Sequence, residues 1–250
     1  MDDSAGWRRY FEDNARSLLD IPWDIGADLT PDEAGAIAPS LQEFQAGERS
    51  EGKHLYRAAQ DYSQRTGDGD YLVAIRLFIA EEQRHARDLG RFLTLNGIPL
   101  VETTFADRVF RRLRVLLPTL EMSVAVLVTA EIIAKVYYAV LREATQSVIL
   151  RRLCDQILSD ERAHVDFQCG QLRRLRAHRS AAAAATTDAL QQGLYAGTLL
   201  VVWWSHRRLI RRGGMTLAGW VVACQREFRD AMRLRPAAAA VERASSAVGS

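Results

Sequence analysis

Lysine is nearly missing from this chain of 250 residues: Lys53 and Lys135 are its two lysines, and arginine supplies the rest of the 33 basic side chains. The 31 acidic residues almost balance them, so the formal net charge at pH 7 is +2. A charge this small does not by itself attract nucleic acid. Acids are interspersed among the arginines, which is typical of solvated helix faces. We therefore expect no nucleic-acid partner.

Cysteine is also scarce. The three cysteines, Cys154, Cys169 and Cys224, are widely spaced, and no Cys-x-x-Cys pair occurs. This pattern argues against a disulfide framework, a zinc ribbon and a rubredoxin-type iron site. A reducing, cytoplasmic location fits this use of cysteine.

Signals for secretion and for membrane insertion are missing as well. The N-terminal stretch is acidic and has no apolar core, so we expect no signal peptide. The longest apolar stretch, 120–141, contains Glu121, Glu131 and Lys135, which would be costly in lipid. The apolar run 194–204 is too short to cross a bilayer, although it could lie on a membrane surface. We expect no transmembrane span.

Proline is limited to six residues and alternating β-branched runs are missing, so the sequence predicts an all-α fold. Thr30, Pro31 and Glu33 form the capping-box signature of a helix start, whereas Gly67 and Gly97 favour helix ends. Helices are predicted at 31–65, 70–95, 118–143, 147–177, 187–211 and 215–234, with a long connection at 97–117.

The order of these segments predicts a four-helix bundle with one long crossover at 31–178. An N-terminal extension, 1–30, precedes it, and additional C-terminal helices at 179–235 pack on it. The tail 236–250 is predicted to be disordered. The alanine-rich segment 177–188 is either a linker or the start of the next helix. An irregular α-helical array is the alternative to the bundle.

One short pattern occurs twice. The sequences EEQRH and DERAH lie 79 residues apart. Each contains Glu-x-x-His, as Glu82 with His85 and as Glu161 with His164. Residues three apart lie on one helix face, so the two side chains of each pair point the same way.

A lone glutamate on the preceding helix accompanies each pair. Glu131 lies at the same height as Glu161 when both are counted from the turn between their helices. By the same count Glu82 pairs with a position near Glu51. Glu48, one turn away on the same face, is the second choice.

Four glutamates and two histidines at one level of a bundle require counter-charge, because burying one unpaired carboxylate costs on the order of several kcal/mol. Two divalent or trivalent metal ions would supply it. The mixed nitrogen and oxygen donors suit iron or manganese better than zinc or calcium.

The order Glu…Glu-x-x-His…Glu…Glu-x-x-His resembles the ferritin-like di-iron carboxylate superfamily. The resemblance implies a ferritin-like four-helix bundle that holds two iron ions, with manganese or a mixed Mn/Fe pair as alternatives. It implies that the metal ligands are Glu51, Glu82, His85, Glu131, Glu161 and His164.

The acid that opens each motif also has a predicted role. Glu81 and Asp160 lie four residues before their histidines. From there each carboxylate could accept the free ring N–H of the histidine on the opposite helix and orient it. A solvated helix acid is the alternative for both.

Three further side chains are candidates near this site. Tyr138 is a candidate radical or proton relay, and Lys135 a candidate for neutralising charge during catalysis. His54 is a candidate added ligand. The alternatives are a core position for Tyr138, a salt bridge or a partly buried stem for Lys135, and an exposed helix position for His54.

These features favour a di-iron oxidase or oxygenase that uses dioxygen to oxidise a small, apolar organic substrate. It would need a separate electron donor, because no rubredoxin-type site is present. Trp203 and Trp204 would pack across the bundle or along the seam of a homodimer. The alternatives are a ferroxidase or iron-handling protein without an organic substrate, and a module whose metals are purely structural.

Overall fold

The computed structural model describes residues 3–49, 52–102, 119–177 and 179–233. These residues form helices and no strand, which confirms the all-α prediction. Most of the predicted crossover and the whole tail 236–250 lie outside the described residues. The elements are α1 (Ser4–Asn14), the 3₁₀ turn η1 (Trp23–Ile25), α2 (Pro31–Glu48), α3 (Lys53–Thr66), α4 (Gly69–Leu95), α6 (Leu120–Ala144), α7 (Val148–Arg176), α8 (Ala181–Arg212) and α9 (Leu217–Arg233).

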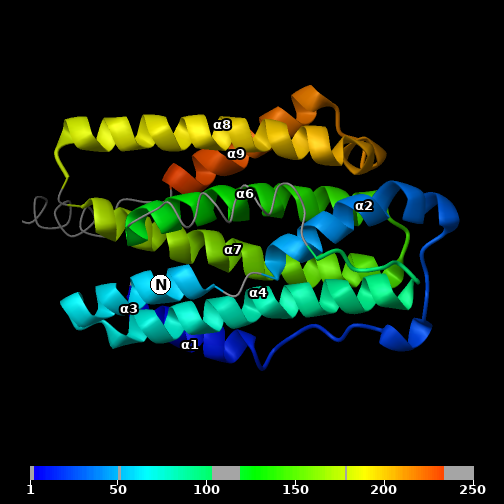
Figure 1. Ribbon diagram of the computed structural model, residues 1–250, viewed down its shortest axis with the longest axis horizontal. Coiled ribbons are helices and arrows are strands. Elements are labelled where there is room, and N and C mark those ends of the chain that lie inside the picture. The colour runs from blue at the N-terminus through cyan, green and yellow to red at the C-terminus, as the bar shows by residue number, and fades with distance from the viewer. Residues whose placement is uncertain (1–2, 50–51, 103–118, 178, 234–250) are drawn as a thin grey trace, which may run out of the picture.

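The helices lie side by side in an elongated bundle (Figure 1). α6 and α7 form a helical hairpin, while α4 packs against α2, α3 and α7. α2 and α3 together occupy the first position of the four-helix bundle. α8 and α9 pack on α6, and α1 packs on α4. The bundle with additional C-terminal helices is therefore confirmed.

The start of α2 is fixed by the predicted capping box. Thr30 Oγ1 accepts the N–H of Glu33, and the Glu33 carboxylate accepts the N–H of Thr30. The other Glu33 oxygen accepts the N–H of Gln146 at 2.6 Å and the hydroxyl of Thr145 at 3.2 Å. Burial opposes ionisation of Glu33, but these hydrogen bonds outweigh it and lower its pKa. The cap thus ties α2 to the turn between α6 and α7.

The prediction of one helix at 31–65 is wrong. α2 ends at Glu48 and α3 begins at Lys53, after Gly52 with φ +60°. A Cβ on Gly52 would lie 2.7 Å from Cδ1 of Ile79 on α4. Glycine therefore permits both the left-handed backbone and the close approach to α4.

We expect Gly52→Ala to lower the free energy of unfolding by about 1–3 kcal/mol, because it adds backbone strain and a clash with Ile79. Chemical denaturation measures the change. Gly47→Ala is the matched control, since Gly47 is helical and a Cβ there would meet nothing within 4 Å. It should raise stability by a few tenths to about 1 kcal/mol. Equal effects of the two substitutions would contradict this account of the break.

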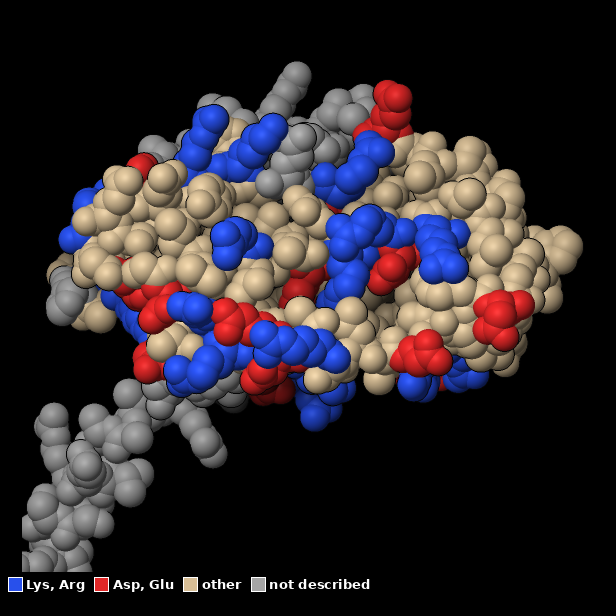
Figure 2. Space-filling model, turned by 90° about the horizontal axis from the view of Figure 1, so that it is seen from below, with Lys and Arg blue, Asp and Glu red and all other residues tan. Residues whose placement is uncertain are grey.

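The segment 177–188 is mostly helical. Ser180 caps α8 by accepting the N–H of Ala183, so the alanine-rich stretch begins that helix rather than forming a linker. Trp203 is buried, whereas Trp204 is 62% exposed on the same helix. On the face seen in Figure 2, basic and acidic side chains are interspersed.

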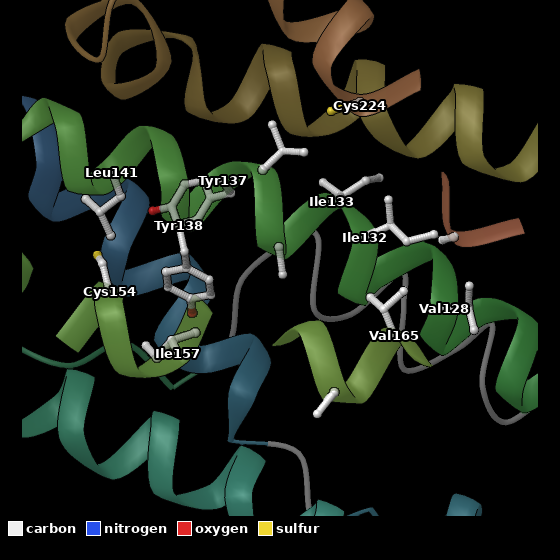
Figure 3. Close-up of a cluster of buried hydrophobic side chains, with 14 of the residues drawn as sticks. Val128, Ile132, Ile133, Tyr137, Tyr138, Leu141, Cys154, Ile157, Val165 and Cys224 are labelled. Carbon is white, nitrogen blue, oxygen red and sulfur yellow. The ribbon is translucent and has the colours of Figure 1, made fainter. Parts of the chain in front are cut away.

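α6 is the most apolar of the described helices and runs through the centre of the fold. It passes a length and composition test for membrane spans, but 67% of its apolar window is buried by neighbouring elements. Figure 3 shows why, since Val128, Ile132 and Leu141 lie among buried side chains that include Ile157 and Val165 of α7. The apolar side chains of α6 are thus explained by their burial in the core of the bundle. All three cysteines are buried and free.

Candidate metal centre

Three helices bring acids and a histidine to one point of the interior. Ligand atoms of Glu82 on α4, Glu131 on α6, and Glu161 and His164 on α7 all lie within 4.8 Å of one another. The last three side chains are almost fully buried, with exposures of 4%, 1% and 0%. This group has enough donors to hold one metal ion.

A second group lies next to the first. Ligand atoms of Glu48 on α2, and of Glu82 and His85 on α4, also lie within 4.8 Å of one another. Glu82 belongs to both groups, which is the position of a carboxylate that bridges two ions. The two groups together supply four glutamates and two histidines.

The two histidines direct the same ring nitrogen toward the acids. His164 Nδ1 lies 3.1 Å from Glu82 Oε1 and 3.7 Å from Glu131 Oε2. His85 Nδ1 lies 3.7 Å from Glu82 Oε1 and 3.9 Å from Glu161 Oε1. The ring centroids are 5.8 Å apart, so both imidazoles face one cluster of carboxylates.

Several atoms at the centre of this cluster are buried and make no hydrogen bond to any described residue. They are both oxygens of Glu161, Oε1 of Glu82, and Nδ1 of His85 and of His164. Buried polar atoms are normally paired, because leaving one unpaired costs about 1–3 kcal/mol. Lone pairs of carboxylate oxygen and imidazole nitrogen that converge in this way fit metal ions.

The other nitrogen of each histidine contacts an acid on the opposite helix. His85 Nε2 on α4 lies 2.9 Å from Asp160 Oδ2 on α7, and His164 Nε2 on α7 lies 2.9 Å from Glu81 Oε2 on α4. A carboxylate that accepts the Nε2–H leaves a lone pair on Nδ1, the nitrogen that faces the cluster. The structure thus places Glu81 and Asp160 in the cross-helix contacts expected of them, and their effect on metal binding stays a prediction.

Asn14, the last residue of α1, connects these two acids. Its amide nitrogen donates to Glu81 Oε1 at 2.7 Å and to Asp160 Oδ1 at 2.8 Å. Asp160 also accepts from Arg84 at 2.7 Å and from Gln156 at 3.0 Å. Burial raises the pKa of Asp160, but the hydrogen bond from His85 and the nearby cations outweigh it, so the net pKa is well below its usual range. One hydrogen-bonded chain thus joins the two histidines across the bundle.

We expect Asn14→Leu to weaken metal binding by roughly tenfold or more, because it removes a donor from both orienting acids at once. A titration of ferrous or manganous ion against a competing chelator measures the affinity. Asp13→Asn is the control, since the neighbouring Asp13 side chain is 76% exposed. Equal affinity of the Asn14→Leu and control proteins would show that α1 does not support the site.

Protonation of the metal-free cluster reflects its crowding. Burial and then the proximity of another glutamate raise the pKa values of Glu48, Glu82 and Glu161. Burial has the same effect on Glu131, but its close contacts with His164 and Glu161 outweigh it and lower its pKa. Burial also lowers the pKa of His164, yet its carboxylate contacts raise it well above the usual value. In the metal-free protein, protons on these groups reduce the repulsion between the carboxylates.

The cluster is more open on the side of α2. The Glu82 side chain is 17% exposed and Glu48 is also partly exposed, whereas His85, Glu161 and His164 are almost completely covered. Among the described residues, the cluster is therefore least covered on the side where α2 faces α4.

The remaining predicted residues occupy different environments. Glu51, predicted as the first-helix ligand, lies outside the described residues, whereas Glu48 is in the second group. His54 is exposed on α3 and belongs to neither group, because the break before α3 turns this stretch away from the α2 axis.

Lys135 forms an ion pair with Glu227 on α9, which is the salt-bridge alternative and gives a catalytic role no support. Tyr138 is fully buried and donates its hydroxyl proton to Glu48 at 2.7 Å.

Three residues of the network were missed in the sequence. Gln156 precedes Asp160 by one helical turn, so helical spacing could have revealed it. Arg84 lies inside the first repeated motif but reaches across to α7. Asn14 belongs to α1, a segment with no spacing relation to the repeat, and only the packing of α1 on α4 brings it to the site.

Comparison with known proteins gives a result at the level of the fold. No protein-family model and no curated protein match this sequence. Among solved structures, a variant of an R2-like ligand-binding oxidase with an aerobically reconstituted Mn/Fe cofactor has a TM-score of 0.63 to this chain at 14% identity. The alignment covers 92% of this chain and 93% of that one. With its buried carboxylate and histidine cluster, the chain has the ferritin-like fold.

Proposed function

We propose that the protein is a di-metal oxidase with either two iron ions or a Mn/Fe pair. The observation that carries the proposal is the convergence of ligand atoms from α4, α6 and α7 on one buried point, where those on α4 and α7 include carboxylate oxygens and Nδ1 atoms without a hydrogen-bond partner among the described residues. The similar solved structure is an oxidase with a Mn/Fe cofactor, which supports the same class of chemistry here. The ligands would be Glu48, Glu82, His85, Glu131, Glu161 and His164.

Metal ions in such a site would supply dioxygen reduction and oxidation of a bound substrate. The residues of the chain have complementary tasks. Glu82 would contribute to holding both ions, while Glu81 and Asp160 would accept the Nε2–H of the two imidazoles and so orient Nδ1 toward the metal. The apolar surroundings on α6 exclude water. Tyr138 holds the carboxylate of Glu48 through its hydroxyl.

Two hollows lie beside the helices that carry the candidate ligands. A hollow of about 740 Å³ lies along α2 and α4, and a smaller one of about 370 Å³ lies between α3 and α4. Both are lined by Gln83, the neighbour of Glu82. The larger one also reaches Gln45, one turn from Glu48. Small organic ligands commonly occupy cavities of this size.

Gln83→Trp tests this route. Gln83 lines both cavities, so a larger side chain there would reduce the space in each. We therefore expect slower oxidation of an organic substrate with unchanged metal content. Parallel assays of substrate turnover and bound metal measure the two effects. Arg76→Trp, which alters the smaller cavity alone, is the control. Equal loss of turnover in both variants would argue against access through the larger cavity.

The central experiment for the proposal is a stopped-flow reaction of the anaerobically loaded protein with dioxygen. We expect the metal centre to be oxidised within one turnover, with decay of the oxidised species accelerated by a substrate among candidate amines, aldehydes and fatty acids. A separate electron donor would then be required for further turnovers. Binding of two ions without any reaction with dioxygen would leave a structural metal site.

Ferroxidase or iron-handling activity without an organic substrate is the second candidate. The partial exposure of the Glu48 and Glu82 side chains favours this activity, because exposed carboxylates can take up ions from solvent. Gel filtration and iron uptake separate the two. A large hollow assembly that accumulates many ferric ions per chain would favour iron handling, whereas a monomer or dimer that stops at about two ions would favour the oxidase.

A further inference from the structure

The outer face of α8 is apolar although it is exposed. Figure 1 shows α8 along one long edge of the bundle, with α6 and α9 below it. The inner face of α8 packs on α2, α6 and α9 and includes the buried side chains of Leu199 and Trp203. Four large apolar side chains on the other face are exposed by 44% to 70%: Leu190, Leu200, Val201 and Trp204. Each of them leaves apolar surface in contact with water.

These exposed side chains form one stripe. Intervals of three or four residues connect Leu190 to Leu200, Val201 and Trp204 through Gly193 and Gly197, so all of them share one helix face. Both glycines are exposed, and a Cβ on either would meet nothing within 4 Å. Single exposed apolar side chains are normal on a protein surface, whereas a continuous apolar stripe indicates a surface that binds a partner or a membrane.

Arginines continue this outer face toward the end of α8. Arg208 and Arg211 follow Trp204 at helical spacing, Arg207 lies beside them, and all three arginines are exposed. None of the three forms an ion pair with a described residue. The stretch 189–212 contains no aspartate or glutamate. By contrast, acidic and basic side chains are interspersed on the face of the bundle seen in Figure 2. The outer face of α8 is thus apolar along most of its length and positively charged at its end.

The helix dipole explains only part of this positive charge. Cations stabilise the negative end of a helix within its last turn, which accounts for Arg211 and Arg212. Arg207 and Arg208 precede that turn. Arg207 instead contacts Trp204, since it donates to the Trp204 carbonyl at 2.6 Å and its guanidinium carbon lies 5.4 Å from the ring centroid. Exposed tryptophan beside arginine is typical of side chains at a membrane–water interface.

We infer that the outer face of α8 binds the surface of a membrane that contains anionic lipids. An amphipathic helix with tryptophan and leucine on one face and nearby arginines lies in the plane of the interface, with its apolar face at the acyl boundary. Trp204 and Leu200 enter that layer, while the three arginines contact lipid phosphates. Because α2, α6 and α9 hold the inner face, α8 lies on the membrane and does not cross it.

A second copy of the chain is a poorer occupant of this face. Contact between two such faces would bury arginines against a surface that has no carboxylate between residues 189 and 212. A negatively charged lipid surface neutralises the arginines and covers the apolar stripe at the same time. Membrane binding through α8 does not require the metal centre, so it can be tested separately from the proposed oxidase activity.

Flotation of the full chain with lipid vesicles tests this inference. We expect the protein to float with vesicles of equal parts phosphatidylcholine and phosphatidylserine, and to bind at least about tenfold more weakly to phosphatidylcholine alone. High salt should weaken the binding, because ions screen the arginines from the lipid phosphates. The double substitution Arg208→Glu with Arg211→Glu should lower the partition coefficient by about tenfold or more.

Tryptophan fluorescence reports whether Trp204 itself enters the bilayer. Phosphatidylcholine brominated in its acyl chains should quench part of the fluorescence of the bound protein. Trp204→Phe should remove most of this quenching while the protein still binds, because phenylalanine keeps an apolar ring at the same position. Trp204→Asp should lower the partition coefficient by about tenfold or more, since a carboxylate then faces the anionic lipid.

The matched control is Arg9→Glu with Arg16→Glu, which changes the net charge by the same amount. Both arginines are exposed, Arg9 on α1 and Arg16 just after it, and α1 lies on the edge of the bundle opposite α8 (Figure 1). This control should bind vesicles as the unaltered protein does. Equal loss of binding in the two double variants, or no binding of the unaltered protein to anionic vesicles, would overturn the inference. A dimer that Trp204→Asp dissociates, in a protein that binds no vesicles, would assign the face to a second copy.

Discussion

Replacing His164 by alanine is expected to reduce the bound iron from about two ions per chain to one or none. His164 Nδ1 is the nitrogen donor of the group formed with Glu82, Glu131 and Glu161. Without the His164 imidazole, the three carboxylates still repel one another, and the nitrogen ligand that Glu81 orients is missing. Elemental analysis after anaerobic loading with ferrous iron and removal of free metal gives the stoichiometry.

The control for this substitution is His54→Ala. His54 was a candidate ligand from the sequence but is exposed on α3, so its loss should leave the metal content unchanged. Circular dichroism of both variants shows whether they are folded, because removing a buried side chain lowers the free energy of unfolding by about 2–5 kcal/mol. A folded His164→Ala protein with two ions would remove His164 from the site.

Without metal, the protein is expected to become less stable as pH rises from about 5 to 8, by on the order of 2 kcal/mol or more. Glu48, Glu82, Glu161 and His164 all have raised pKa values in the folded state. The stability that their protonated forms contribute is full below their unfolded pKa values, and it is lost as pH rises through the folded values. The lowered pKa values of Glu131 and Asp160 act in the opposite sense, but their contribution is lost only as pH falls below the ordinary carboxyl range.

Bound metal should reverse this trend. Metal ligands must lose their protons before they bind, so the stabilisation by metal grows with pH. Urea unfolding at several pH values, with excess chelator and with saturating ferrous iron, compares the two states. Glu161→Gln should flatten the metal-free profile because it removes one of the four groups. A metal-free protein whose stability increases from pH 5 to 8 would contradict the described clustering of charges.

The sequence was informative about the site wherever helical spacing is regular. Glu82, His85, Glu161 and His164 repeat at a fixed interval, and each pair shares one helix face by simple geometry. Glu131 could be added by counting from the turn at 145–147. These five residues meet in the structure because α4, α6 and α7 are continuous helices over the counted distance.

The same counting is less informative where the helix is not continuous, and its first choice, Glu51, lies outside the described residues. It treated 31–65 as one helix, whereas Gly52 interrupts it. The second choice, Glu48, has a ligand atom within 4.8 Å of those of Glu82 and His85. The left-handed glycine and its contact with Ile79 depend on α4, which local sequence does not reveal. Asn14 was missed for the same reason, since only tertiary packing brings this polar side chain to its contacts on α4 and α7.

Anomalous X-ray diffraction from crystals of the metal-loaded protein, at the iron and manganese edges, tests the central claim most directly. The account predicts two peaks inside the bundle, one among Glu82, Glu131, Glu161 and His164 and the other among Glu48, Glu82 and His85. Metal peaks only at the protein surface, or an empty cluster in crystals grown with excess iron and manganese, would contradict it.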